Sequence, residues 1–281
     1  MTSSLSLANA SLSSQGPTAD LSLAPGQLLA VFGPPNSGKS RLLKLAHEGG
    51  TLPQGTIISR VPAAHCAPGC VNGKTTPAKC AALAGGSTSS ASAGEALYLL
   101  QLEQVHNKPV AELSGGVRAM CDLLPCLASN ARLLLFDASF DTLDPWSLER
   151  ALVCLRKRLQ AGAAAVVVTG SARVAQMASL LLVLDRGTPR FLGTANDLLE
   201  RSQLSEVTVK THDQPGVRAL VEPLQIKLEE LKDGVRFTAP KGQELAAKLL
   251  LAGYGDVEAI VVRRPTLLEA IRTLVQPRSS V

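Results

Sequence analysis

The chain has 281 residues, of which 46% are hydrophobic, 18% charged and only eight aromatic, and its formal charge is +5. Lysine and arginine exceed aspartate and glutamate by 17 to 13 in residues 1–205 and by 11 to 10 in residues 206–281, so neither part is a polybasic tail. With so few aromatic side chains to stack on bases, nucleic-acid binding is a poor hypothesis. The composition is typical of a globular protein.

The expected localisation follows from what the sequence lacks. No apolar run approaches the roughly 18 to 20 residues that span a bilayer. The first stretch, MTSSLSLANASLSS, has no basic region of the kind that opens a secretory or mitochondrial leader. We therefore expect a cytoplasmic chain, and its mild positive charge would suit a place beside the anionic inner leaflet of the plasma membrane.

The first predicted elements surround a glycine-rich loop. Residues 20–32, DLSLAPGQLLAVF, predict an edge strand, a Pro-Gly turn and a buried strand, and SRLLKLAHE predicts a helix. Between strand and helix, GPPNSGKS fits the phosphate-loop pattern G-x-x-x-x-G-K-[ST]. Backbone N–H groups of such a loop and of the helix start hold phosphate oxygens. The predicted nucleotide-binding residues are Gly33, Pro34, Pro35, Asn36, Ser37, Gly38, Lys39, Ser40 and Arg41.

Individual side chains of this loop predict how it binds ATP. Lys39 would reach the terminal phosphates, and Ser40 would ligate Mg²⁺. Asn36 stands where glycine is common, which is tolerable because asparagine adopts positive φ more readily than most residues. Pro35 removes one N–H and should weaken the phosphate cradle slightly. A loop retained for structure alone is the alternative interpretation.

The stretch from about 62 to 95 is rich in Ala, Gly, Ser, Thr and Pro, which predicts loop or poorly ordered structure. In a cytoplasmic chain the six cysteines are expected to be reduced thiols. Four zinc-type side chains do fall in this stretch, and a metal site is the open alternative. They are His65, Cys66, Cys70 and Cys80, and their spacing matches no paired CxxC pattern.

Helices and strands alternate in the rest of the first part. Helices are predicted at GEALYLLQLEQV and GGVRAMCDLLPCLASN, a strand at 132–137, a helix at 145–160, and two further strands at AAAVVVTG and LLLVLD. This alternation predicts a doubly wound α/β sheet. The strand at 132–137 ends in Asp137, which we expect to hold Mg²⁺ together with Ser40. Trp146, after Pro145 at a helix start, is expected to serve packing.

The pattern changes near Ser205. Shorter segments, from EVTVK to PTLLEAIRTLV, predict a small α+β unit without a chemical motif of its own. We therefore expect two domains, residues 1–205 and 206–281. The first should include a helical subdomain over about residues 74–128.

A second motif, LSGGVRAM, covers Leu113 to Met120 and lies between the phosphate loop and Asp137. The order GPPNSGKS, LSGG, LLLFD and FDTLD resembles the ATP-binding subunits of ABC transporters over residues 1 to about 200. The tail RRPTLLEAIRTLV resembles the C-terminal extension of the subfamily that serves drug, polysaccharide and gliding-motility exporters. The fold implied is a P-loop NTPase domain of the ABC type with a short helical subdomain and a small C-terminal α+β domain.

The resemblance implies that two such subunits meet head to tail. Each ATP, with Mg²⁺, would lie between the phosphate loop of one subunit and the LSGG signature of the other. Glycines and a serine at a helix start offer N–H donors and a positive dipole end to a phosphate. An ordinary serine N-cap would explain LSGG in isolation, but not within this order of motifs. The residues that would serve the partner's ATP are Leu113, Ser114, Gly115, Gly116 and Asp144.

The groups that this family uses for hydrolysis are missing. Ala138 stands at the position of the glutamate beside the metal-binding aspartate. Gly170 and Ser171 follow VVVT, where the family has a histidine. Ala63 and Ala64 stand where a glutamine is expected after the strand predicted from TIISRVP. Residues 1–31 contain no aromatic residue to stack on adenine, as the family usually has, so four functional groups are absent together.

What remains serves ATP binding and the partner's site. The expected function is therefore a catalytically degenerate ATP-binding subunit of a heterodimeric ABC exporter. It would work with a second ATPase subunit that has an intact glutamate and histidine, and with membrane-spanning permease subunits at the inner face of the plasma membrane. One alternative is an active ATPase with Asp141 as the base, although Asp141 is expected to point away on its turn. A regulatory or scaffold protein outside transport is the other alternative.

Overall fold

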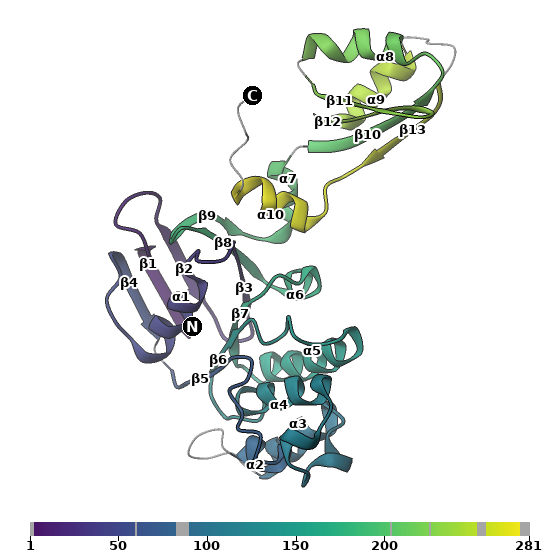
Figure 1. The fold of residues 1–281 in the computed structure, drawn as a ribbon. Helices are drawn as coiled ribbons and strands as arrows, with labels where there is room; N and C mark the ends of the chain where they lie inside the picture. The colour runs from purple at the N-terminus through teal and green to yellow at the C-terminus, as the bar shows by residue number, and fades with distance from the viewer. Residues whose placement is uncertain are drawn as a thin grey trace. The chain divides into compact units, whose positions relative to one another are not determined.

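The structure, a computed structural model, describes residues 3–59, 61–82, 90–202, 204–224, 226–251 and 257–275. The chain divides into two compact units, Met1–Ala195 and Asn196–Val281, which are described one at a time (Figure 1). The phosphate loop, the LSGG motif and Asp137 all lie in the first unit. The sequence analysis placed the border between the two domains after residue 205, and that border stays a prediction.

The first unit is built on a six-stranded sheet. Its order is β5-β6-β7-β3-β8-β9, and all neighbouring strands are parallel except the antiparallel pair β8 and β9. This confirms the predicted α/β class. The strands are β3 (Leu28–Phe32), β5 (Ala63–Cys66), β6 (Leu133–Asp137), β7 (Ala164–Val168), β8 (Leu180–Asp185) and β9 (Thr188–Gly193).

Both faces of this sheet are covered, which explains why its central strands read as continuous apolar runs. Leu133 and Leu135 pack on one side with α1 and the N-terminal strands, whereas Leu134 and Phe136 pack on the other side with the helical layer. The first layer contains α1 (Lys39–Glu48) and an antiparallel sheet in the order β2-β1-β4. Its strands are β1 (Leu5–Ser11), β2 (Ala19–Leu23) and β4 (Gln54–Ser59).

The second layer is helical (Figure 1). Its members are α2 (Pro77–Ala82), α3 (Ser90–Leu99), η1 (Glu103–Val105), η2 (Val110–Glu112), α4 (Gly115–Leu127), α5 (Pro145–Gln160) and α6 (Ala172–Met177). Helix α4 continues through Pro125 although proline removes one backbone donor from a helix interior. The buried apolar side of α4, which includes Leu123 and Leu124, holds it against the core.

Two expectations for residues 51–95 were only partly right. The stretch from 62 onward is not simply loop, because it contains β5 and α2; residues 83–89 lie outside the described part. The strand predicted from TIISRVP ends at Ser59, and Ala63 and Ala64 lie inside β5, opposite Leu133 and Leu134. Pairing with the buried strand β6, rather than intrinsic propensity, makes this alanine-rich segment a strand.

The second unit contains a four-stranded antiparallel sheet in the order β11-β12-β10-β13. Its strands are β10 (Leu204–Thr211), β11 (Leu228–Leu231), β12 (Gly234–Pro240) and β13 (Val257–Arg263). The chain order β-α-β-β-α-β with this strand order is the ferredoxin-like motif. Its helical elements are α7 (Ala195–Ser202), α8 (Gln214–Val221), η3 (Glu222–Leu224), α9 (Gly242–Leu251) and α10 (Leu267–Val275), of which α8 and α9 pack against the sheet.

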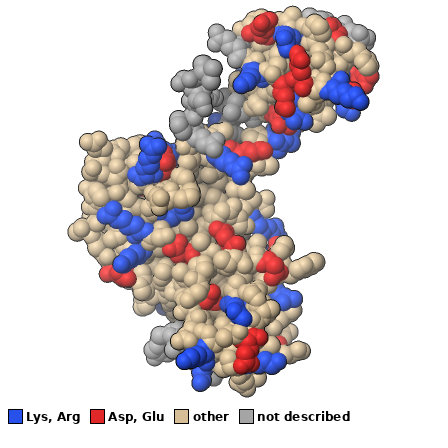
Figure 2. All heavy atoms as spheres, viewed as in Figure 1, with Lys and Arg blue, Asp and Glu red and all other residues tan. Residues whose placement is uncertain are grey.

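The surface of the described ranges carries charges of both signs and several exposed large apolar side chains, among them Tyr98, Trp146 and Leu251. On the face shown in Figure 2, basic and acidic side chains are interspersed rather than gathered into one basic patch. None of the helices in the described ranges is both long enough and apolar enough to cross a membrane.

Candidate nucleotide-binding site

Three parallel strands end side by side at the candidate site. The order β6-β7-β3 places Asp137, Val168 and Val31 in one row across the sheet. Since neighbouring strands lie about 4.8 Å apart, this row sets Asp137 roughly 10 Å from β3, whose end becomes the phosphate loop. Ligands of open α/β sheets bind beyond such carboxyl ends.

The phosphate loop adopts a conformation that depends on its glycines. Gly33 has φ 155°, and a Cβ there would lie 2.2 Å from the carbonyl oxygen of Leu184. Gly38 (φ 96°) directly precedes α1, and Asn36 (φ 62°) occupies the left-handed region. The prediction that Asn36 accepts positive φ is therefore confirmed. The loop delivers the chain into the N-terminus of α1, where phosphate is favoured.

Lys39 is held by its own loop. Its Nζ donates hydrogen bonds to the carbonyl oxygens of Gly33 (2.9 Å) and Pro34 (2.7 Å) and to Oγ of Ser37 (3.2 Å). Burial lowers the pKa of Lys39, while the charges of Asp137 and Asp141 act in the opposite direction. Phosphate oxygens would have to replace these loop acceptors around the ammonium group.

Ser40 and Asp137 have the chemistry that Mg²⁺ requires. Both offer oxygen ligands, which this hard cation prefers. Ser40 is exposed at the start of α1, and the carboxylate of the half-buried Asp137 accepts no hydrogen bond from the described residues. The residues therefore fit the metal: they would hold it beside the phosphates, where it would neutralise charge.

The strands define where the residues lie that the sequence analysis compared with the family's catalytic groups. Ala138 directly follows β6 with φ 55°, and its N–H donates to the carbonyl oxygen of Val168 at 3.1 Å. Gly170 lies just beyond β7. After β5 the chain continues with Ala67 and Pro68, so the corrected strand end has no glutamine either. The residues at these positions are thus Ala138 after β6, Gly170 after β7 and Ala67 after β5.

Asp141 does not point away, contrary to expectation. Its Oδ1 accepts a hydrogen bond from Oγ1 of Thr169 (2.5 Å), and its Oδ2 accepts one from the N–H of Gly170 (2.8 Å). The turn after β6 therefore reaches back to the end of β7, close enough for the Asp141 charge to act on Lys39. Both carboxylate oxygens are engaged in this contact.

The LSGG motif forms the start of α4. Ser114 occupies the N-cap position with φ −63° and ψ 159°, yet its side chain makes no capping hydrogen bond. Ser114 and Gly115 are exposed, and a Cβ on Gly115 would meet nothing within 4 Å. Ser114 and Gly115 thus leave the first residues of this helix accessible at the surface. An ordinary serine N-cap would instead spend its hydroxyl on the helix.

Asp144 joins the turn after β6 to this signature surface. Its Oδ1 accepts the N–H groups of Trp146 and Ser147, both at 3.0 Å, and its Oδ2 accepts Oγ of Ser147 at 2.5 Å. A Cβ on Gly116 would lie 3.0 Å from Asp144 Oδ2. The second signature glycine therefore permits close packing of the two segments, a contact that no sequence pattern indicated.

A buried acid, missed by the sequence analysis, anchors the loop after β5. Asp122 of α4 accepts N–H groups from Gly69 (2.7 Å) and Val71 (3.0 Å). It is only 9% exposed, on the side of α4 that faces the core. An acid within the apolar stripe AMCDLLPCL was the available signal, since buried carboxylates need partners. The loop and the signature helix are thereby linked.

Trp146 is 79% exposed, so the expectation that it serves packing was wrong. It lies in the first turn of α5, two residues after the N-cap residue Asp144. The open zinc alternative finds no support in the described ranges, where no three His, Cys, Asp or Glu side chains cluster. Burial raises the pKa of the Cys66 thiol and raises that of Cys70 to about 11.

Comparison with known proteins decides the family. A family model described as ABC transporter matches residues 18–140. The hemin import ATP-binding protein HmuV of Streptomyces coelicolor is 30% identical over 220 residues, which are 70% of this chain and 77% of that protein. The chain belongs to the ATP-binding proteins of ABC transporters. The ATP-binding domains of this family bind ATP with Mg²⁺.

Two further likenesses agree with this assignment. The taurine import ATP-binding protein TauB of Pseudomonas syringae is 36% identical over 147 residues. That region is 47% of this ABC protein but only 56% of TauB, so the match spans about half the length of that relative. A chain from a structure described as a metal-chelate type ABC transporter in an inward-facing conformation matches with a TM-score of 0.60. It covers 85% of this chain and 98% of its own length, and at 19% identity it supports the fold alone.

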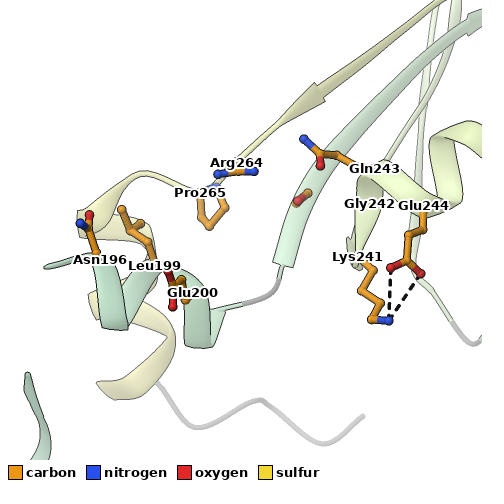
Figure 3. A pocket seen from close by; sticks show the side chains of 10 residues that line it. Asn196, Leu199, Glu200, Lys241, Gly242, Gln243, Glu244, Arg264 and Pro265 are labelled. Carbon is orange, nitrogen blue, oxygen red and sulfur yellow. Dashed lines mark hydrogen bonds and ion pairs between the residues drawn. The ribbon is translucent and has the colours of Figure 1, made fainter. Parts of the chain in front are cut away.

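The second unit of this ABC protein has a hollow of its own, of about 500 Å³ (Figure 3). It is lined by α7, by the start of α9 and by Arg264 and Pro265 after β13. Lys241, directly before α9, forms an ion pair with Glu244 at 3.2 Å, and Glu200 adds a second acidic side chain to the lining. Charges of both signs line the hollow, and no nucleotide motif lies in it.

Proposed function

We propose that this chain is the non-catalytic ATP-binding half of a heterodimeric ABC ATPase pair. Its signature surface would complete the partner's ATP site, where hydrolysis takes place. The observation that carries the proposal is the contrast at the strand ends. Ala138 and Gly170 leave the chain's own site without a base or a histidine, whereas Ser114 and Gly115 remain open on the surface.

The chain's own site would bind Mg·ATP without splitting it. Lys39 would contact the terminal phosphates, and Ser40 and Asp137 would hold the metal. The residue that approaches the phosphate loop from the N-terminal sheet is aliphatic: Leu12 Cδ1 lies 2.8 Å from where a Gly38 Cβ would stand. Losing an aromatic stack on adenine should weaken binding by about 1 to 3 kcal/mol, by analogy with base stacking on aromatic side chains.

The structure also argues against Asp141 as a replacement base. A general base must come within hydrogen-bond distance of the water it activates. Asp141 instead uses its two oxygens on Thr169 and Gly170 at the end of β7. This contact fixes the turn that carries Asp144. We therefore assign Asp141 to the support of that turn.

The partner would be a second ABC ATP-binding subunit that has the glutamate and histidine this chain lacks. Both would work with membrane-spanning permease subunits, at the inner face of the plasma membrane. Relatives of this chain include proteins named for import and proteins named for export. We favour export because the tail RRPTLLEAIRTLV resembles the extension of exporter subunits.

The test is to measure Mg·ATP binding and hydrolysis by the purified chain, with Lys39→Ala as the control. We expect saturable binding that depends on Lys39 and no turnover above background. Turnover of about 1 per second or faster would contradict the proposal, since that is the range of ordinary enzymes. If that activity were then lost in Asp141→Asn, Asp141 would be identified as the base.

A further inference from the structure

The two edges of the four-stranded sheet in the second unit differ in their protection. β11 at one edge has four residues, LEEL, with Glu229 and Glu230 in the middle. β13 at the other edge has seven residues, and its middle, AIVV, carries no charge. Short length and central charges protect an edge against pairing with another strand. β13 has neither protection.

The side chains of β13 also lack complete burial. Ile260 and Val262 pack only partly against the core under the helices, and Val261 on the opposite face of the strand is 56% exposed. No strand of the described residues pairs with the outer side of β13, and the unpaired N–H and C=O groups of an edge strand form a template for another strand. A further strand beside β13 would extend the sheet and bury these three side chains.

We propose that β13 pairs antiparallel with β13 of a second copy of this chain, about a two-fold axis through Val261. Such an axis, perpendicular to the sheet, keeps the two faces of both strands in common. Val261 then lies opposite Val261 of the second copy, and Ile260 lies opposite Val262. Directly opposed apolar side chains are the units that stabilise antiparallel pairs.

Charge complementarity favours this register. It also favours a second copy of this chain as the source of the strand that pairs with β13. With Val261 at the axis, Glu258 lies opposite Arg264 of the second copy, and the reverse pair forms symmetrically. Arg264 is exposed and has no ion-pair partner among the described residues. Glu258 Oε1 lies 3.1 Å from His212 Nε2, which leaves its other oxygen for an arginine.

The neighbouring registers lose this match. Shifting the axis to Ile260 sets Glu258 opposite Val262, and shifting it to Val262 sets Arg264 opposite Ile260. Arg263 does not compete for Glu258, because it is already paired with Glu206 (3.3 Å) and Glu269 (3.1 Å). The sequence of β13 and the residue after it is thus self-complementary in one antiparallel register.

Sedimentation of the full chain without nucleotide tests this pairing. Over about a hundredfold range of concentration, we expect the mass to rise from 29.3 kDa toward twice that value. Val261→Lys should weaken association by about tenfold or more, because it places two like charges at the axis. Thr238→Lys is the matched control, since Thr238 is exposed on the inner strand β12 and should leave association unchanged.

Charge reversal identifies the register. Glu258→Arg alone and Arg264→Glu alone should each weaken association, and the double variant should restore it. A chain that stays monomeric throughout, or a dimer that ignores all these variants, would overturn the proposal. Circular dichroism checks that each variant is folded.

The proposed pairing is independent of the proposed function. Lys39→Ala should leave the β13 dimer intact, whereas a dimer formed through the nucleotide sites would require ATP. The two proposals can therefore fail separately.

Discussion

Two regions of the first unit differ in the chemical groups that they present. At the ends of β6 and β7, Ala138 and Gly170 offer no group that could activate water. At the start of α4, Ser114 and Gly115 remain exposed, and Asp144 packs against Gly116. Each residue of such a site should therefore be assessed by the ATP site that it would serve, its own or that of a partner subunit. Under the proposed function, the groups that bind nucleotide or face the partner are present where the chain's own catalytic groups are not.

The largest expected effect is an asymmetry between these two regions. In the complex purified through a tag on this chain, Ser114→Arg should reduce ATP hydrolysis by about a hundredfold or more, because it blocks the donors at the partner's phosphates. Lys39→Ala should reduce hydrolysis less than about threefold, since it touches only the site that we propose to be non-catalytic. Steady-state phosphate release measures both. Equal losses in the two variants would show that both sites hydrolyse ATP and would break the comparison.

Glycine substitutions should separate the regions by stability. Gly33→Ala should lower the free energy of unfolding by about 3 kcal/mol or more, because its Cβ would strike the Leu184 carbonyl oxygen at positive φ. Gly115→Ala, which meets nothing within 4 Å, should change it by less than about 0.5 kcal/mol. Denaturant unfolding provides the measurement. A large loss in Gly115→Ala would mean that the signature glycine has a structural role that the exposed surface does not show.

Asp122 tests whether the loop after β5 depends on the signature helix. Asp122→Ala leaves the N–H groups of Gly69 and Val71 without their acceptor, and should cost about 2 to 3 kcal/mol. Asp122→Asn keeps one acceptor oxygen and should cost less. Hydrogen exchange of these two amides, with the free energy of unfolding, gives the readout. Unchanged protection in Asp122→Ala would show that the loop is held by other contacts.

The smallest effect concerns the charge of Asp144. Two hydrogen bonds from Ser147 hold the pKa of Asp144 below the ordinary 3.8. The bond from its hydroxyl group has the larger effect, and the bond from its N–H has the smaller one. A depressed pKa contributes stability that is present above the ordinary value and is lost as the pH falls through the folded-state pKa. Ser147→Ala should raise the pKa of Asp144 toward 3.8, as followed by NMR titration. An unchanged midpoint would mean that the cap does not hold the carboxylate in solution.

The central strands could be predicted from the sequence because each of them is marked by its own run of apolar residues. LLLF and AVVV are continuous apolar runs, as strands buried on both faces must be. β5 was not predicted because AAHC has no such run, and its strand conformation depends on pairing with β6. β1 was not predicted at all, because its LSLANAS segment was considered only as a possible leader.

The same distinction holds for the candidate site. The positive φ of Asn36 followed from the chemistry of one residue. The contacts of Asp141 with Thr169 and Gly170 join segments 28 residues or more apart, and no motif encodes them. Trp146 was assigned to packing because large aromatic side chains are mostly buried, but a capped helix start at the surface overrides that tendency.

The hydrogen bonds of Lys39 have a consequence for the heat of ATP binding. Because Lys39 already braces the loop through Gly33, Pro34 and Ser37, nucleotide binding exchanges acceptors around a fixed frame and orders little chain. Ordering of chain and burial of apolar surface are what make a binding heat capacity strongly negative. With adenine unstacked, as we propose, both contributions are small. The binding enthalpy of this ABC protein should therefore vary little with temperature.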